Sequence, residues 1–417
     1  MLKTQIVPAT AEQLARAGEL IRRGALVAFP TETVYGLGAC GLCPNAVQKI
    51  FDAKGRPADN PLILHVANMS AAQQLTLDWP PAALQAAKAF WPGPLTVILP
   101  KSAAVPDIVT AGLPNVAVRV PANPIALALI RAAGCPIAAP SANRSGRPSP
   151  TTAAHVYEDL AGRVALILDE NLGGQGVSTL GEDLSEQGVS TLDKNVKMGA
   201  QNAASLAAHG VAIGKSVPVS YGLESTVVDF SGPVPTILRP GGITHEMLCH
   251  LLGHVEISPA VLAQTHGPVA SPGMKYTHYA PRARVILLDT DAPALVARVR
   301  AAANAVALVS RMDAPLHQLC QQAGVAHLCM DEADLPDTQS AQGNANVTDG
   351  SGTQGNANAP GTPTDPVNPP YAKLFQALRQ ADAQGYQTIF ALLPPAVGMG
   401  LAARNRLLRA AGFVVNK

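Results

Sequence analysis

Residues 54–62 contain one glycine and two prolines in nine positions, and this spacing constrains the fold more than any other stretch of the chain. A helix interior cannot hold it, because proline removes a backbone donor and clashes with the preceding turn. The apolar run at 62–66 follows at once and is typical of a strand. The sequence therefore predicts a stiff loop at the lip of a strand. Lys54 and Arg56 on that loop suit a multiply charged anion such as a triphosphate, and the alternative is an ordinary solvated loop.

Short apolar runs alternate with amphipathic segments along the rest of the chain, which indicates an α/β protein. Strands are predicted at 25–29, 95–99, 116–120, 137–139, 226–230 and 236–239, and helices at 11–24, 45–53, 70–91 and 124–133. Beyond position 284 the pattern restarts with strands at 284–289, 305–310, 325–329 and 387–392, and with helices at 292–303, 371–383 and 399–411. With 417 residues, 47% of them hydrophobic, the chain is large enough for two cores.

Two segments interrupt this pattern. Residues 170–214 are rich in Gly, Ser, Asn and Gln, and the hexapeptide at 175–180 recurs at 187–192. Residues 331–370 contain no lysine, arginine or aromatic residue and repeat Gln-Gly-Asn-Ala-Asn. Both compositions are typical of flexible insertions that cannot bury enough apolar surface to fold. The domain organisation predicted is therefore 1–259 with the first insertion, an ordered linker at 260–283, and a smaller domain at 284–417 with the second.

Polar side chains follow several of the predicted strands. Residues 30–38 place hydroxyls and a carboxylate between a strand and a glycine turn, which is a plausible pocket lip, although Thr31 and Thr33 could merely cap a turn. Arg119 ends a valine-rich strand, where it could clamp a carboxylate or lie flat with its charge in water. The loop at 140–151 carries serines, an asparagine and arginines that suit phosphate oxygens, or it is a plain polar loop.

Three other patterns are given less weight. Residues 36–41 match GxGxxG, but six residues (30–35) separate them from the preceding strand and Pro44 delays the helix, so dinucleotide binding is not favoured. Cys40 and Cys43 form a single CxxC whose nearest further donors are distant, so the six cysteines are expected to be reduced and structural. Arg404 and Arg406 on the last helix are interpreted as a solvated face.

Net charge and hydropathy bound the class of protein. A formal charge of +1 argues against a general nucleic-acid-coating protein, although a local basic cleft stays open. There is neither a charged-then-apolar leader nor an apolar run long enough to cross a bilayer, so a cytoplasmic protein without membrane contact is expected.

Eight motifs occur in an order that closely resembles the YrdC-like threonylcarbamoyl-AMP synthase family, in its long form with a C-terminal accessory domain. They are PTETVYGLG at 30–38, KGRP at 54–57, NPL at 60–62 followed by His65, RVP at 119–121, PSANRSG at 140–146, ESTVVD at 224–229, LRPGG at 238–242 and SPGMKY at 271–276. The resemblance implies a YrdC-like twisted mixed sheet with flanking helices, plus a smaller Rossmann-like α/β domain. It also implies formation of threonylcarbamoyl-AMP and pyrophosphate from L-threonine, bicarbonate and ATP, for tRNA modification beside the anticodon.

The resemblance assigns roles position by position. Lys54 and Arg56 would be the catalytic residues that neutralise phosphate charge. L-Threonine would be held by Thr33, His65, Arg119 and Ser225, with Arg119 as the carboxylate clamp. ATP would be held by Arg56, Asn60, Ser141, Ser149, Arg239 and Tyr276, and Mg²⁺ would arrive with ATP rather than at a protein metal site. The product would pass to the tRNA threonylcarbamoyl transferase machinery, with a weak tRNA contact.

The chain departs from the family pattern where some fifty residues replace a short link before Glu224, close to the expected threonine pocket. Two alternatives remain at this point. An RNA-binding module using the same cleft without catalysis would show salt-sensitive RNA affinity with no need for threonine, and the near-neutral charge argues against it. A carbamoyl-handling relative with another substrate is less consistent with the complete set of threonine-pocket residues.

Overall fold

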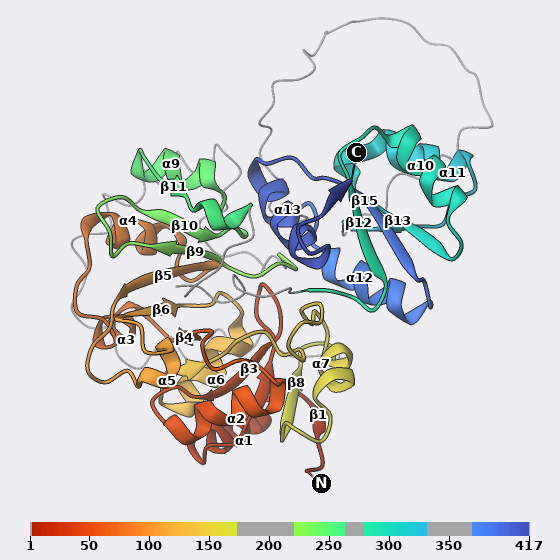
Figure 1. Cartoon of the computed structure of the whole chain (residues 1–417). Coiled ribbons are helices and arrows are strands. Elements are labelled where there is room, and N and C mark those ends of the chain that lie inside the picture. The colour runs from red at the N-terminus through yellow and green to blue at the C-terminus, as the bar shows by residue number, and fades with distance from the viewer. Residues whose placement is uncertain (1, 173–220, 263–278, 332–368, 417) are drawn as a thin grey trace, which may run out of the picture.

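The structure is a computed structural model that describes residues 2–172, 221–262, 279–331 and 369–416. The predicted insertions at 170–214 and 331–370 fall almost entirely outside these residues, as do positions 263–278 of the predicted linker. Tyr276 therefore lies outside the described residues. Two sheets are present within the described residues, and Figure 1 shows them in two adjacent units, with the N-terminus on one and the C-terminus on the other.

Within the described residues the first sheet has eleven strands in the order β1-β8-β2-β3-β7-β4-β6-β5-β9-β10-β11. The strands are β1 Gln5–Pro8, β2 Val27–Phe29, β3 Gly36–Cys40, β4 Ile63–His65, β5 Leu95–Pro100, β6 Asn115–Arg119, β7 Ile137–Ala138, β8 Leu166–Asp169, β9 Thr226–Asp229, β10 Thr236–Arg239 and β11 Glu256–Ile257. The sheet contains parallel pairs, such as β4 with β6, and antiparallel pairs, such as β5 with β6, so the expected mixed sheet is confirmed.

Helices cover both faces of this sheet, and each face has its own apolar core. They are α1 Ala11–Arg22, α2 Pro44–Lys54, α3 Met69–Gln74, α4 Pro81–Phe90, α5 Asp107–Thr110, α6 Pro124–Ala133, α7 Ala153–Leu160, α9 His245–Leu252 and the short 3-10 turn η1 Pro259–Val261. Side-chain caps define several starts: Thr10 accepts from the backbone of Gln13, and Asn123 accepts from Ile125 and Ala126. The predicted strands and most predicted helices are confirmed, because their apolar spacing coincides with the buried faces.

The predicted single helix at 70–91 is wrong. The chain forms α3, leaves the helix to make an isolated bridge between Thr76 and Lys101, and restarts as α4. Pro80 and Pro81 explain the break, because proline disfavours helical geometry at the residue before it yet is well placed in the first turn of a new helix. The prediction of Lys54 on a loop is also wrong: Lys54 is the last residue of α2, and Gly55 ends that helix in the left-handed conformation at φ 61°.

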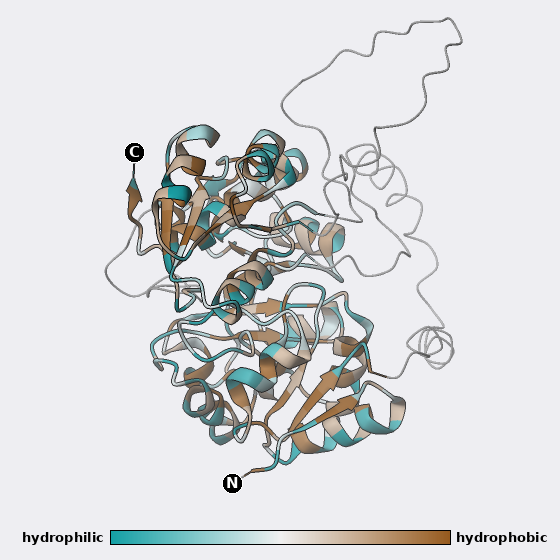
Figure 2. Cartoon of the chain, turned by 90° about the vertical axis from the view of Figure 1, so that its right-hand side faces the viewer, coloured by the Kyte–Doolittle hydropathy of each residue, from teal (hydrophilic) through white to brown (hydrophobic). Residues whose placement is uncertain are grey.

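The second sheet contains five described strands, all parallel, in the order β14-β13-β15-β12-β16. Its elements are β12 Arg284–Leu288, α10 Ala292–Ala301, β13 Ala305–Val309, η2 Arg311–Asp313, α11 Ala314–Gln322, β14 His327–Cys329, α12 Leu374–Ala383, β15 Thr388–Leu392, α13 Gly398–Ala410 and β16 Val415–Asn416. Separate apolar cores involve α10 with α11 and α12 with α13, which is the layered arrangement expected of a smaller α/β domain. In Figure 2 the strands of both sheets are mainly brown, and teal is concentrated on the surrounding helices and loops.

Helices α12 and α13 lie at the boundary between the two units (Figure 1). The apolar core beneath them includes Val34 and Leu223 from the first unit together with Phe375 and Met399 from the second. Tyr279 completes this core, with its ring centroid 5.2 Å from that of Phe375. The two units therefore share buried apolar surface next to the segments that carry the predicted site.

Candidate active site

A pocket forms where β4, β6 and β10 end, and its lining includes Thr33, His65, Arg119, Ser225 and Arg239. The strand ends converge because β4 and β6 are parallel, and their register places His65 directly beside Arg119. The lining also includes Arg56, Ser141, Glu224 and Tyr279. The tertiary structure thus brings together residues from motifs up to about two hundred positions apart.

Arg119 lies at one end of the pocket in a dense polar group. Its Nη1 and Nη2 donate to Thr33 Oγ1 at 3.1 and 3.2 Å, and its Nε donates to the Gly93 carbonyl at 3.2 Å. Glu32 forms an ion pair with it, at 2.7 Å between Nη2 and Oε1, and both side chains are almost fully buried. Thr31 accepts from the backbone of Thr33 and Val34 and so caps the turn, whereas Thr33 faces the arginine.

His65 is a neutral imidazole in this pocket. Burial, followed by the positive charge of Arg119, lowers the pKa of its side chain to about 3. Its Nδ1 is buried and has no hydrogen-bond partner among the described residues. The ring meets Phe29 edge to face at a centroid distance of 6.4 Å, which fixes its orientation. A neutral donor or acceptor for a small polar substrate is therefore in place next to the arginine.

Arg239 and Ser225 form a second buried polar group. Arg239 Nε and Nη2 donate to the Ser225 carbonyl at 3.1 and 3.0 Å, and Nη2 also donates to Ser225 Oγ at 3.0 Å. Thr96 Oγ1 lies 2.8 Å from the same hydroxyl. Gly241 permits the close approach of the two segments, because a Cβ there would lie 2.3 Å from the Glu224 carbonyl oxygen. Burial lowers the pKa of Arg239 to about 10, so the group stays cationic at neutral pH.

Arg56 is the third arginine of the lining. Its guanidinium donates to the Asn60 carbonyl at 3.3 Å and to the Pro61 carbonyl at 3.1 Å, and burial lowers its pKa to about 10. The amide side chain of Asn60 is fully buried, and neither its nitrogen nor its oxygen has a partner among the described residues. Because buried polar atoms are usually paired, this amide is a candidate ligand group.

Lys54 does not face the pocket. It is buried, and its Nζ donates to the Ser141 carbonyl at 2.6 Å and to the Asn143 carbonyl. Burial, followed by the charge of Arg56, lowers the pKa of this amine well below its usual range. Its visible task is to fix the loop on which Ser141 borders the pocket, while a direct role on phosphate remains a prediction.

Sequence reasoning assigned no role to Glu224, Tyr279 or Arg406, and it interpreted Arg406 as part of a solvated face. That interpretation is wrong. Arg406 is fully buried, and its Nε pairs with Glu224 Oε2 at 2.9 Å. Ser149 is also fully buried and donates its hydroxyl to Glu224 Oε1 at 2.5 Å. Glu224 stands in a recognised motif and Tyr279 follows the predicted Tyr276 by three positions, so the sequence could have indicated both as site residues. The pairing of Arg406 with Glu224 has no signal in the sequence.

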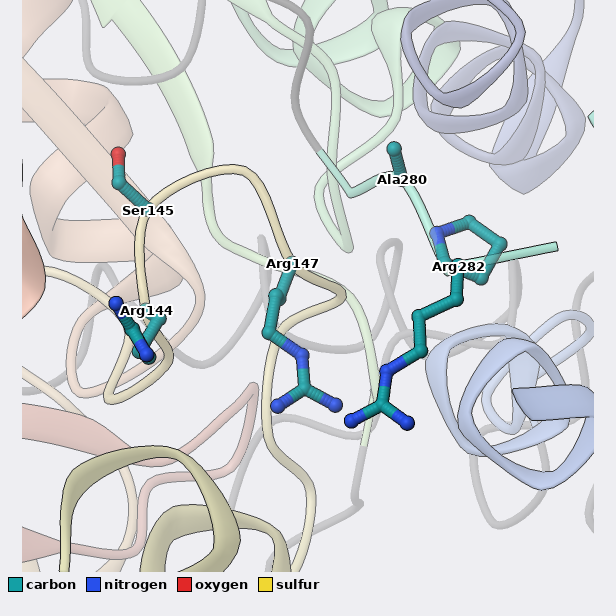
Figure 3. Close-up of a pocket in the computed structure, with 6 residues that line it drawn as sticks. Arg144, Ser145, Arg147, Ala280 and Arg282 are labelled. Carbon is teal, nitrogen blue, oxygen red and sulfur yellow. The ribbon is translucent and has the colours of Figure 1, made fainter. Parts of the chain in front are cut away.

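A second pocket of about 360 Å³ lies between the loop after β7 and the segment entering the second unit. Arg144, Arg147 and Arg282 line it, and in the view of Figure 3 the side chains of Arg147 and Arg282 extend in a similar direction. Arg147 also pairs with Glu158 at 2.7 Å and with the buried Asp159. The pocket offers exposed cations at its rim, since Arg144 and Arg282 are exposed.

Among the described residues no three His, Cys, Asp or Glu side chains gather to hold a metal ion. None of the six cysteines, Cys40 and Cys43 included, forms a disulfide in the described part of the chain. The GxGxxG match at 36–41 is largely strand β3, paired antiparallel with β2, so it is not a dinucleotide-binding turn. No helix in the described part of the chain is both long and apolar enough to cross a membrane.

Comparison with known proteins gives consistent matches. A family model of the Sua5, YciO and YrdC proteins, described as "Telomere recombination", matches residues 19–192. A model described as "Threonylcarbamoyl-AMP synthase, C-terminal domain" matches residues 243–412.

The threonylcarbamoyl-AMP synthase of Pyrococcus abyssi is 38% identical over 405 residues, covering 96% of this chain and 94% of the relative. That of Bacillus subtilis is 38% identical over 403 residues, covering 96% and 93%. A crystal structure of P. abyssi Sua5 complexed with L-threonine is 34% identical and covers 99% of this chain and 98% of its own, with a TM-score of 0.70.

Proposed function

Because the chain belongs to the threonylcarbamoyl-AMP synthase family, we propose that its pocket forms threonylcarbamoyl-AMP and pyrophosphate from L-threonine, bicarbonate and ATP. The observation that carries this proposal is the arrangement of three buried arginines around one pocket. Arg119 stands with Thr33 and His65, and Arg56 and Arg239 border the same space. Such a site offers guanidinium groups for a substrate carboxylate and for a polyphosphate.

L-Threonine is assigned to the group around Arg119. A guanidinium binds a carboxylate through charge-assisted hydrogen bonds, and Thr33 and His65 add neutral polar atoms beside it. Glu32 already neutralises part of the charge of Arg119, so the bound carboxylate shares the cation with a buried internal carboxylate. Ser225, the residue before β9, is the fourth residue assigned to threonine, and Thr96 and Arg239 hold its hydroxyl in place.

ATP is assigned to the lining around Arg56, Ser141 and Arg239, together with the unpartnered amide of Asn60. The predicted contact from Tyr276 lies outside the described residues, and Ser149 reaches this lining through its hydrogen bond to Glu224. Mg²⁺ is proposed to enter as part of MgATP. Glu224, a carboxylate of the pocket lining, is paired with Arg406, so the phosphate oxygens and water would supply most of its ligands.

The chemistry needs positioning more than acid or base groups. The neutral amine of threonine adds to bicarbonate, and loss of water gives a carbamate. A carbamate oxygen then forms a bond to the α-phosphorus as the bond to the leaving pyrophosphate breaks. The carbamate and ATP are both anionic, and negative charge develops on the phosphate oxygens during the reaction. Fixed guanidinium groups therefore lower the barrier by neutralising this charge and by holding the reacting groups in line. The catalytic assignment of Arg56 follows from this need. Lys54 holds the Ser141 loop, and its direct action on phosphate stays a prediction.

The product is proposed to pass to the transferase machinery that modifies tRNA. A weak tRNA contact is assigned to the pocket of Arg144, Arg147 and Arg282, because its exposed cations suit a phosphate of a passing nucleic acid. Charge reversal at Arg144 and Arg282 should abolish any salt-sensitive tRNA retention and leave pyrophosphate release unchanged.

The test of the function is pyrophosphate release from MgATP, with threonine and bicarbonate omitted in turn. Release that requires both supports the synthase, and mass spectrometry of the nucleotide product should show threonylcarbamoyl-AMP. Salt-sensitive RNA binding with no threonine-dependent release would instead favour the RNA-binding alternative. The same assay on a chain lacking 173–220 decides whether that segment limits the reaction.

A further inference from the structure

One carboxylate in the pocket lining is shared between the two units. Glu224 immediately precedes Ser225, and its Oε1 accepts the hydroxyl of Ser149 at 2.5 Å. Its Oε2 accepts from Nε of Arg406 at 2.9 Å, although Arg406 belongs to helix α13 of the second unit. Both side chains of this ion pair are almost fully buried. The carboxylate is thus held from one side by the first unit and from the other by the second.

Arg406 makes further contacts in the same place. Its Nη1 donates to the Pro240 carbonyl at 2.7 Å, directly after Arg239, and to Asn405 Oδ1 at 3.1 Å. Its guanidinium lies 5.7 Å from the ring centroid of Tyr279, which also lines the pocket. One fully buried side chain therefore touches the segments of Glu224, Arg239 and Tyr279, which approach the pocket from three directions.

We propose that Arg406 is a positioning residue through which helix α13 sets the nucleotide-binding end of the pocket. It acts through Glu224, which orients Ser149, and through the Pro240 carbonyl, which fixes the backbone next to Arg239. This inference rests on the proposed function, because the nucleotide end is defined by that reaction. Arg406 itself need not touch ATP.

The charges around Glu224 show why an arginine is needed there. Burial by itself raises the pKa of this carboxyl, but the charges of Arg406 and Arg239 and the hydrogen bonds from Ser149 and Arg406 outweigh it, so the pKa is lowered. Tyr279 and Lys54 also act on it electrostatically. Without Arg406, Glu224 would be less acidic, and its protonated form would become a donor where Ser149 now donates.

A purely structural arginine would behave differently, and α13 supplies a matched control. Arg409 is one turn further along the helix, is equally buried, and donates to the Ala260 carbonyl at 3.2 Å across the same boundary. Arg409→Met therefore removes a buried arginine and an inter-unit hydrogen bond at η1. Arg406→Met removes a buried arginine together with its ion pair to Glu224. A kinetic difference between the two variants at similar loss of thermal stability isolates the effect of position.

The experiment uses the full chain with Arg406→Met, Arg406→Lys and Arg409→Met. Pyrophosphate release gives KM for ATP and for threonine, equilibrium binding of MgATP is measured separately, and melting temperatures report stability. Arg406→Met is expected to raise KM for ATP at least tenfold and KM for threonine less than threefold, with a pH profile whose acid limb moves upward. Arg406→Lys keeps the charge but lacks the two-pronged guanidinium group, so it cannot form both hydrogen bonds. Its KM for ATP should therefore lie between that of Arg406→Met and that of the parent chain.

Equal effects of Arg406→Met and Arg409→Met on KM for ATP would overturn the proposal, as would parallel rises of KM for both substrates. If Arg406→Met does not fold, Arg406→Lys decides: an unchanged affinity for MgATP overturns it, and a selective loss of that affinity supports it. Failure of the proposed function is distinguished by the parent chain, which would then release no pyrophosphate with threonine and bicarbonate present. MgATP binding by the variants still tests the role of Arg406 in that case.

Discussion

Replacing Arg119 by methionine tests the threonine assignment and separates it from stability. Arg119 does two things in the structure: it faces the pocket beside Thr33 and His65, and it neutralises the buried Glu32 at 2.7 Å. Arg119→Met keeps most of the side-chain volume and removes the charge. Both functions are lost together in this variant, so a second substitution is needed to tell them apart.

The two losses have different magnitudes. Leaving Glu32 as an unpaired buried charge should cost about 3–5 kcal/mol of unfolding free energy. Losing a charge-assisted hydrogen bond to the threonine carboxylate should cost about 1.5–3 kcal/mol. At about 1.4 kcal/mol per factor of ten, that is a rise of roughly 10- to 150-fold in KM for threonine. KM for ATP should change much less, because the arginines assigned to ATP are untouched.

The double variant Glu32→Gln/Arg119→Met provides the separation. It carries no unpaired buried charge at this site, so most of the lost unfolding free energy should return, while KM for threonine should stay raised. Chemical denaturation measures the first quantity and pyrophosphate release at varied threonine measures the second. A double variant with the threonine KM of the parent chain would refute the clamp assignment, because Arg119 would then serve only to neutralise Glu32.

Three further predictions follow from individual side chains. The pKa of His65 is about 3 in the folded chain, whereas an unfolded histidine has a pKa of about 6.5, so between these values only the unfolded chain binds a proton at this residue. The free energy of unfolding should therefore fall as pH drops through that window. Chemical denaturation at pH 4.5 and 7.5 should show a smaller fall in His65→Asn. Lys54→Met leaves two loop carbonyls unpaired and should cost about 1–3 kcal/mol for each, with a raised KM for ATP; an unchanged melting temperature would contradict this. Gly241→Ala should lower the melting temperature and activity together, since its Cβ would lie 2.3 Å from a backbone oxygen that cannot move aside; wild-type values for both would show that the loop can relax.

Much of the local structure follows from the sequence because it depends on neighbours. Helix α2 ends where Gly55 allows a left-handed residue, and the strands coincide with apolar runs that end at proline or glycine. The broken helix at 70–91 was missed although its signal was present, since Pro80 and Pro81 stand in the middle of an otherwise helical pattern. The motif residues were found for the same reason: each motif is a short continuous segment.

The environment of a polar side chain is different, because it depends on residues far away in the chain. Lys54 and Arg56 have the same charge and are two positions apart, yet one amine is held by the carbonyls of a neighbouring loop and the other cation lines the pocket. Sequence spacing does not indicate which of the two side chains faces the pocket. The packing of α2 against the loop that follows β7 determines this.

Arg406 shows the division most clearly. From its sequence α13 carries three arginines and a solvated face is the natural interpretation, because a buried unpaired guanidinium would be too costly. Burial becomes favourable only when a carboxylate and carbonyls are supplied, and Glu224 lies 182 positions away in the chain. The sequence by itself determined the elements, the motifs and the chemistry they suit. Only the tertiary structure decided which charges are buried together, because desolvation and pairing are properties of the assembled fold.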